Sequence, residues 1–236
     1  MKLLLTSGGI NNASIHDALI ELLDKPIAES NALCIPTAQH GHPMCTPASV
    51  WRFIAGQGSA THMCALGWKS MGVLELTALP TIDKERWVPW VREADVLLVD
   101  GGEATYLAHW MRETGMADLL PSLSDTVWVG VSAGSMVLTP RIGHEFVKWT
   151  PPTGGDSTLG VVDFSIFPHL DYEGWSENTM AEAERWAADI AGPSYAIDEQ
   201  TAIKVTDGIV EVVSEGNWRL FNPRLRCGRH SNGSPN

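Results

Sequence analysis

The residues with the clearest chemical potential lie in the segment Gly130–Gly134, whose sequence Gly-Val-Ser-Ala-Gly fits the pattern G-x-S-x-G. The β-branched stretch Thr126–Val131 leads into it, and a helix-like stretch follows. A tight strand-to-helix turn needs small residues around its serine, because the serine backbone is strained and its neighbours approach closely. Such a turn presents Ser132 Oγ at a helix N-terminus, where the Ala133 amide can stabilise an oxyanion. The pattern indicates a nucleophilic serine, and the alternative is an ordinary turn that closes a βα unit.

A second glycine-bearing turn precedes this one in the chain. The apolar stretch Asp95–Val99 leads into Asp100-Gly101-Gly102, and a helical pattern follows from Ala104. In parallel sheets, ligands bind outside the carboxyl ends of the strands, so both turns can face one crevice. Gly102 N–H is then the second oxyanion donor.

A nucleophilic serine needs a general base, and the chain has eight histidines. His169 directly follows the short strand-like segment Ser165–Pro168, so it lies at another strand end. His144 lies in an irregular segment and is the second candidate, whereas the others fall in helices, upstream loops or the polar C-terminal stretch. We therefore predict His169 as the base, the alternative being a surface-loop histidine without a catalytic role.

Taken together, these motifs resemble a known family. Gly130–Gly134, the upstream Asp100–Thr105 and Pro168-His169, with His169 37 residues after Ser132, look like the aspartyl dipeptidase (dipeptidase E) and cyanophycinase family of serine peptidases. The similarity covers roughly Lys2 to Val213. It implies a three-layer α/β sandwich with a mainly parallel central sheet, similar to the class I glutamine amidotransferase domain. It also implies Ser132 as nucleophile, His169 as general base, and Gly102 and Ala133 as oxyanion donors.

The acidic member of the triad is less sharply indicated. The segment Tyr195–Ala202 looks like the family segment that places a carboxylate near the histidine, which points to Glu199. Other family members have been assigned an acid between the serine and the histidine, where this chain offers Glu145 and Asp156. We favour Glu199, and the alternative is a solvated hairpin carboxylate.

Two departures from the family pattern concern specificity. The family often has asparagine or glutamine after the glycine pair, whereas this chain has Glu103, whose charge disfavours an acidic substrate group nearby. Aspartyl-specific members use an arginine after the histidine to hold the substrate carboxylate, but here Met180 occupies that region and no arginine precedes Arg185. We therefore expect that an N-terminal aspartate is not preferred. If it is, Arg185 and Arg141 are the next candidates for a clamp.

The elements that must position these residues follow a βα alternation, in which short apolar runs alternate with amphipathic stretches. The predicted strands are Lys2–Thr6, Asn31–Ile35, Gly72–Thr77, Asp95–Val99, Thr126–Val131 and Ser165–Pro168, with a closing hairpin of Thr201–Val205 and Ile209–Val213. The predicted helices are Ile15–Ala28, Pro47–Ala55, Ser59–Met71, Lys84–Ala94, Ala104–Thr114 and Ser176–Ala191. We expect one domain over residues 1–223 and a flexible tail over residues 224–236.

Composition limits the partners. The 16 basic and 28 acidic residues give a net charge of −12, which disfavours nucleic acid and anionic membrane surfaces. The four cysteines form no CxxC pair, which fits a reducing cytoplasm. No cofactor is expected, because G-x-G-x-x-G, P-loop and H-E-x-x-H patterns are absent. The expected partner is a short peptide substrate, with a homodimer as the candidate assembly.

The leading functional hypothesis is a cytoplasmic serine hydrolase that cleaves short peptides. An α/β-hydrolase esterase would place its histidine late, at His230 in the polar tail, and would need an HGGG-type loop that the sequence lacks. A cysteine amidotransferase relative would carry cysteine where Ser132 stands. The remaining alternative is a non-catalytic module of the same fold that binds or senses a small molecule.

Overall fold

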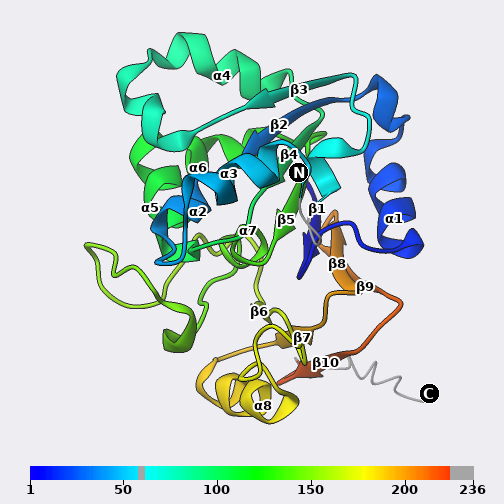
Figure 1. The fold of residues 1–236 in the computed structure, drawn as a ribbon, viewed down its shortest axis with the longest axis vertical. Coiled ribbons are helices and arrows are strands. Elements are labelled where there is room, and N and C mark those ends of the chain that lie inside the picture. The colour runs from blue at the N-terminus through cyan, green and yellow to red at the C-terminus, as the bar shows by residue number, and fades with distance from the viewer. Residues whose placement is uncertain (58–61, 224–236) are drawn as a thin grey trace, which may run out of the picture.

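A seven-stranded, mainly parallel sheet forms the centre of the molecule (Figure 1). The computed structural model describes residues 1–57 and 62–223. The strand order is β3-β2-β4-β5-β1-β8-β9, in which the first five strands are parallel and the last two are antiparallel to their neighbours. The strands are β1 (Lys2–Thr6), β2 (Asn31–Ile35), β3 (Ser70–Val73), β4 (Val96–Val99), β5 (Val127–Val131), β8 (Thr201–Thr206) and β9 (Ile209–Ser214).

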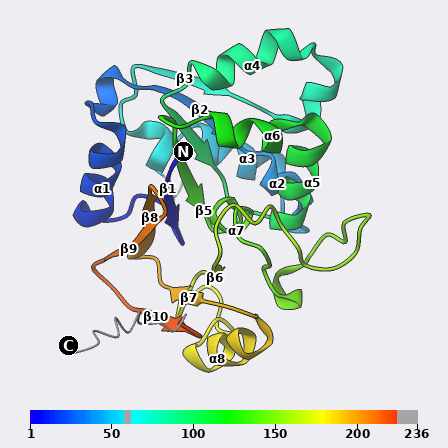
Figure 2. The same ribbon diagram turned by 180° about the vertical axis from the view of Figure 1, so that it is seen from behind.

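Helices cover both faces of this sheet, because its strands are apolar on both sides. Leu4 and Val129 pack with α1 (Ala13–Leu23) and with Phe53 of α3 (Pro47–Ile54). Leu5 and Trp128 pack on the opposite face with α4 (Lys84–Arg92) and α5 (Ala104–Thr114). The result is a three-layer sandwich, with α1 and α4–α5 at opposite sides of Figure 2. The shorter helices are α2 (Ala38–Gly41), α6 (Met116–Leu119) and α7 (Ala133–Met136), with 3₁₀ helices at Ile27–Glu29, His62–Ala65, Leu76–Thr81, Leu120–Ser122 and His144–Phe146.

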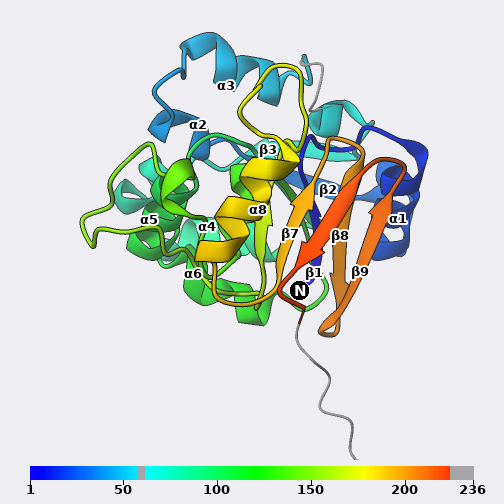
Figure 3. The ribbon, with the colours of Figure 1, turned by 90° about the horizontal axis from the view of Figure 1, so that it is seen from below.

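A second, three-stranded sheet lies beyond one end of the central sheet and has its own small core. It comprises β6 (Ser165–Phe167), β7 (Ser194–Ile197) and β10 (Trp218–Phe221), in the order β10-β7-β6. The helix α8 (Met180–Asp189) lies beside β7, as Figure 3 shows from below. Phe167, Trp186 and Ala196 are members of this core. This sheet matters for function because its strands lead directly into the site.

The structure confirms the predicted α/β sandwich and most of its elements. The helix Ala104–Thr114 is present with the predicted bounds, and Gly115 ends it at a φ of 76°. The helix predicted over Ser59–Met71 is wrong within the described residues, because Ser70–Val73 pairs with β2 as strand β3. The predicted strand Gly72–Thr77 is cut short at Val73, since a 3₁₀ helix begins at Leu76. The predicted tail, residues 224–236, with His230, lies outside the described residues.

Candidate active site

The turn between β5 and α7 has the backbone that a nucleophile elbow requires. Ser132 has φ 49° and ψ −110°, a conformation that non-glycine residues rarely adopt. A Cβ on Gly130 would lie 2.4 Å from the Gly134 carbonyl oxygen, and one on Gly134 would lie 2.3 Å from the Val99 carbonyl oxygen. Both positions therefore require glycine. The turn leaves Ser132 half-buried, between the central sheet and the small sheet.

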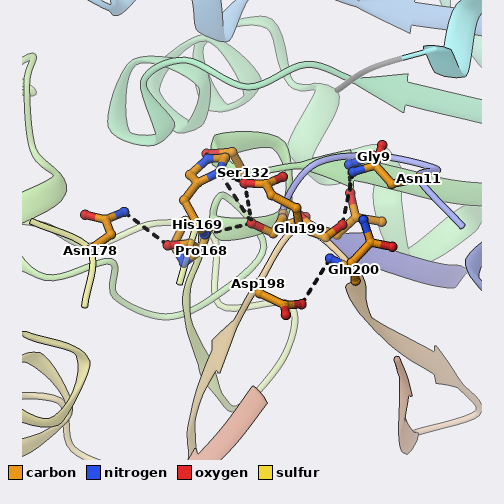
Figure 4. Close-up of polar contacts among 12 residues, drawn as sticks. Gly9, Asn11, Ser132, Pro168, His169, Asn178, Asp198, Glu199 and Gln200 are labelled. Carbon is orange, nitrogen blue, oxygen red and sulfur yellow. Dashed lines mark hydrogen bonds and ion pairs between the residues drawn. The ribbon is translucent and has the colours of Figure 1, made fainter. Parts of the chain in front are cut away.

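A continuous chain of polar contacts connects Ser132, His169 and Glu199 (Figure 4). Ser132 Oγ lies 2.8 Å from His169 Nε2. On the other side of the ring, His169 Nδ1 contacts Glu199 Oε1 in a short polar contact. When the Ser132 hydroxyl donates to Nε2, the proton of the neutral imidazole is on Nδ1 and is donated to the carboxylate. The structure thus brings together the three residues predicted as nucleophile, base and acid.

His169 is held by the residues that follow β6. Its φ is 58°, so it lies in the left-handed region. The neighbouring Leu170 N–H donates to the Ile197 carbonyl at the end of β7 (3.1 Å), and Asn178 Nδ2 donates to the Pro168 carbonyl (3.2 Å). The Trp175 ring packs edge-on against the imidazole with 4.1 Å between ring centroids. These contacts leave His169 only 8% exposed and fix the plane of its ring.

Glu199 lies in the three-residue connection between β7 and β8, which joins the small sheet to the central sheet. The Asp198 carboxylate organises this turn, because it accepts hydrogen bonds from Gln200 N (3.0 Å), Thr201 Oγ1 (2.7 Å) and Asn217 N. Asn11 Nδ2 donates to the Glu199 carbonyl (3.0 Å). The acid is therefore tied to both sheets, which explains how it reaches a histidine that follows β6.

The predicted oxyanion donors face the same cavity as the serine. Gly102 and Ala133 both line the cavity that Ser132 and His169 line. Gly102 has φ 133°, and a Cβ there would lie 2.4 Å from the Ala38 carbonyl oxygen, so only glycine fits. The preceding Asp100 is 2% exposed, and its Oδ1 accepts the Gly101 N–H at 2.7 Å. Burial raises the pKa of the Asp100 carboxyl to about 7.

The alternative acids have other positions. Asp156 accepts hydrogen bonds from Arg141 Nε (3.1 Å) and Gly143 N (2.9 Å), which fix the segment before η5 (His144–Phe146). Burial raises the pKa of Asp156, but these hydrogen bonds outweigh burial and lower it overall. Glu145 lines the cavity, but the ring nitrogens of His169 contact Glu199 and Ser132 instead. The exposed His144 does not line the cavity.

Glu103 has a structural task that the sequence argument did not foresee. It is 1% exposed and caps α5, where its carboxylate accepts from Tyr106 N and Thr105 Oγ1. It also accepts from Lys148 N (3.1 Å), which ties the loop after η5 to this helix. Glu103 is not among the cavity-lining residues. Its charge is therefore directed into a network of donors rather than toward a bound substrate.

The cavity has a volume of about 680 Å³, and its lining holds more carboxylates than lysines or arginines. Its lining includes three carboxylate side chains and one lysine, which are Glu145, Glu177, Glu182 and Lys148. The two arginines considered as clamps are not among the lining residues. Arg141 pairs with Asp156, and Arg185 pairs with the cavity-lining Glu182, so one of the three carboxylates already has a cationic partner. Within the described part of the chain, no group of three or more His, Cys, Asp or Glu side chains is arranged to hold a metal ion.

One buried residue beside the triad was missed by the sequence analysis. Ser7 follows β1, is fully buried, and its Oγ accepts the His169 backbone N–H at 2.7 Å. The signal was available, because a polar residue at the carboxyl end of a central parallel strand lies where ligands and catalytic groups gather.

Comparisons with known proteins give the family and support the fold. A protein-family model described as Peptidase family S51 matches residues 3–213. A candidate peptidase E protein from Listeria monocytogenes EGD-e superposes with a TM-score of 0.67 and 21% identity, over 91% of this chain and 98% of that one. A peptidase from an acI-B1 Actinobacterium gives a TM-score of 0.67 and 20% identity, over 95% of each chain. No curated protein matches. None of the helices in residues 1–57 and 62–223 has the length and apolar character needed to cross a bilayer.

Proposed function

The chain belongs to peptidase family S51, a family of serine peptidases, and on that premise we propose that it hydrolyses short peptides in the manner of a dipeptidase. The family membership confirms the resemblance drawn from the sequence motifs. The proposed catalytic residues are Ser132, His169 and Glu199, and the proposed oxyanion donors are the Gly102 and Ala133 amides. The observation that carries the proposal is the unbroken contact chain from Ser132 through His169 to Glu199 at the wall of the cavity.

In the proposed reaction, Ser132 Oγ attacks the scissile carbonyl carbon while its proton passes to His169 Nε2. Glu199 accepts a hydrogen bond from His169 Nδ1–H and stabilises the imidazolium. The carbonyl oxygen becomes an oxyanion that accepts hydrogen bonds from the Gly102 and Ala133 amides. His169 then protonates the departing amine, which leaves an acyl-enzyme. Water attacks this ester, gives its proton to His169, and releases the acid as Ser132 regains its proton.

A fluorophosphonate probe tests the proposed function without knowledge of the substrate. The native protein is expected to be labelled at Ser132, as located by mass spectrometry of the digested adduct, because only an activated serine reacts rapidly. Heat-unfolded protein is the control and should remain unlabelled. If the native protein is not labelled, or is labelled equally after unfolding, the alternative of a non-catalytic binding or sensing module replaces the peptidase.

We further predict that Asp-X dipeptides are poorer substrates than Ala-X, Leu-X and Lys-X dipeptides. The cavity lining has three carboxylates, of which Glu182 is paired with Arg185, against one lysine, and no unpaired arginine lines the cavity to form a fork with a substrate carboxylate. A second carboxylate in such a site is repelled, whereas a neutral or cationic side chain is accommodated. The measurement is kcat/KM for the four dipeptide series. A tenfold advantage for Asp-X, equivalent to about 1.4 kcal/mol, would contradict the prediction.

A further inference from the structure

The end of strand β1 contacts the nucleophile and the base at adjacent residues. The Thr6 carbonyl accepts the Ser132 backbone N–H at 3.0 Å. Ser7 Oγ accepts the His169 backbone N–H at 2.7 Å. Because these acceptors are consecutive in the chain, one short piece of β1 fixes the positions of two residues that belong to different sheets. The 2.8 Å contact between Ser132 Oγ and His169 Nε2 therefore depends on this strand end.

The Ser7 hydroxyl also lies beside the side chains of the base and the acid. Its Oγ is 3.4 Å from His169 Nδ1 and 3.5 Å from Glu199 Oε1. In the tautomer in which Nδ1 carries the proton, the imidazole offers no acceptor at Nδ1, so the Ser7 proton can be donated only to the carboxylate. A hydroxyl that donates to Glu199 and accepts from the His169 backbone fixes both partners of the same ion pair.

We propose that Ser7 is a positioning residue, which holds His169 in its left-handed backbone conformation and orients the Glu199 carboxylate toward Nδ1. This inference rests on the proposed function of Ser132, His169 and Glu199. His169 has φ 58°, a conformation that costs energy in a non-glycine residue, and a buried hydrogen bond to its amide offsets that cost. Ser7 is not among the cavity-lining residues, so its hydroxyl acts through the base.

The test compares Ser7→Ala with a matched control, Ser30→Ala. Ser30 is also fully buried, and its hydroxyl donates to the Pro26 carbonyl at 3.0 Å, at the end of the 3₁₀ helix Ile27–Glu29 before β2. We expect Ser7→Ala to slow fluorophosphonate labelling of Ser132 by about 10- to 100-fold, because a small displacement of a catalytic group has effects of that size. With a cleavable dipeptide, kcat should fall by the same factor and KM should stay within about twofold. Ser30→Ala should label at the wild-type rate.

Ser7→Cys separates the effect of the hydrogen bonds from that of packing, and it replaces Ser7→Ala as the test variant if Ser7→Ala does not fold. A thiol fills similar space but is a weak donor and acceptor, so we expect the same slow labelling as for alanine. Wild-type labelling of either variant, or a change in KM alone, would overturn the proposal. The failure of the proposed function would look different, since wild-type protein itself would then not be labelled at Ser132.

Discussion

Ser132→Ala and His169→Ala are each expected to abolish peptide turnover while the protein remains folded. Removal of one triad member lowers kcat on the order of 10⁴- to 10⁶-fold, because the remaining members act only as a unit. Ser132 is half-buried, and neither Ser132 nor His169 belongs to the apolar cores, so neither truncation removes a core side chain. The measurements are kcat for a cleaved dipeptide and the thermal unfolding midpoint of each variant.

The double variant and a matched histidine control make this experiment sharper. Ser132→Ala/His169→Ala should be no slower than Ser132→Ala alone, since residues that act as a unit have non-additive effects. His144→Ala should keep wild-type turnover, because the exposed His144 does not line the cavity. If Ser132→Ala or His169→Ala retained more than about a tenth of wild-type activity, that residue would lose its assigned role.

The parts of the site that could be predicted from sequence are those determined by local chain geometry. The elbow at Ser132 needs Gly130 because a Cβ there would meet the Gly134 carbonyl four residues on, and although Gly134 is required by contact with the distant Val99 carbonyl, the short pattern of both glycines around the serine indicates the elbow. Gly102 is similar, because its φ of 133° suits glycine and its strand is a clear apolar run. His169 was predicted as the base because it directly follows a short strand-like segment. In each case, the signal lies within about ten residues of the functional atom.

The parts that the sequence could not provide depend on contacts between distant segments. The place of Ser7 after a central strand indicates a functional edge of the sheet, but nothing near Ser7 identifies His169, 162 positions away, as its partner. The strands β7 and β10 were not predicted, because each gains its partners only when the small sheet assembles. Glu103 shows the opposite error. Its carboxylate is a local helix cap that accepts a hydrogen bond from Tyr106 N. From sequence we expected its charge to repel an acidic substrate group instead.

Gly8→Ala is expected to inactivate the enzyme by displacing the Glu199 carboxylate, although Glu199 itself is not mutated. A Cβ on Gly8 would lie 1.7 Å from Glu199 Oε2, so the carboxylate must leave its position beside His169. Gly8 has no left-handed φ, and the clash falls mainly on the end of a flexible side chain, so the backbone tolerates alanine. We expect kcat to fall on the order of 10³- to 10⁴-fold, close to the effect of Glu199→Ala.

A double-mutant cycle decides whether Gly8→Ala acts through Glu199. In the Glu199→Ala background the clashing carboxylate is absent, so adding Gly8→Ala should change kcat by less than about threefold. The Asn11 amide nitrogen lies 2.7 Å from the same added Cβ, and any effect transmitted through Asn11 would persist in that background. If the decreases in kcat caused by Gly8→Ala and Glu199→Ala were additive, the effect of Gly8→Ala would come from the β1–α1 loop itself and not from Glu199. A fully active Gly8→Ala variant would remove Glu199 from the triad and return Glu145 and Asp156 to consideration, because a carboxylate required beside His169 cannot share its space with a methyl group.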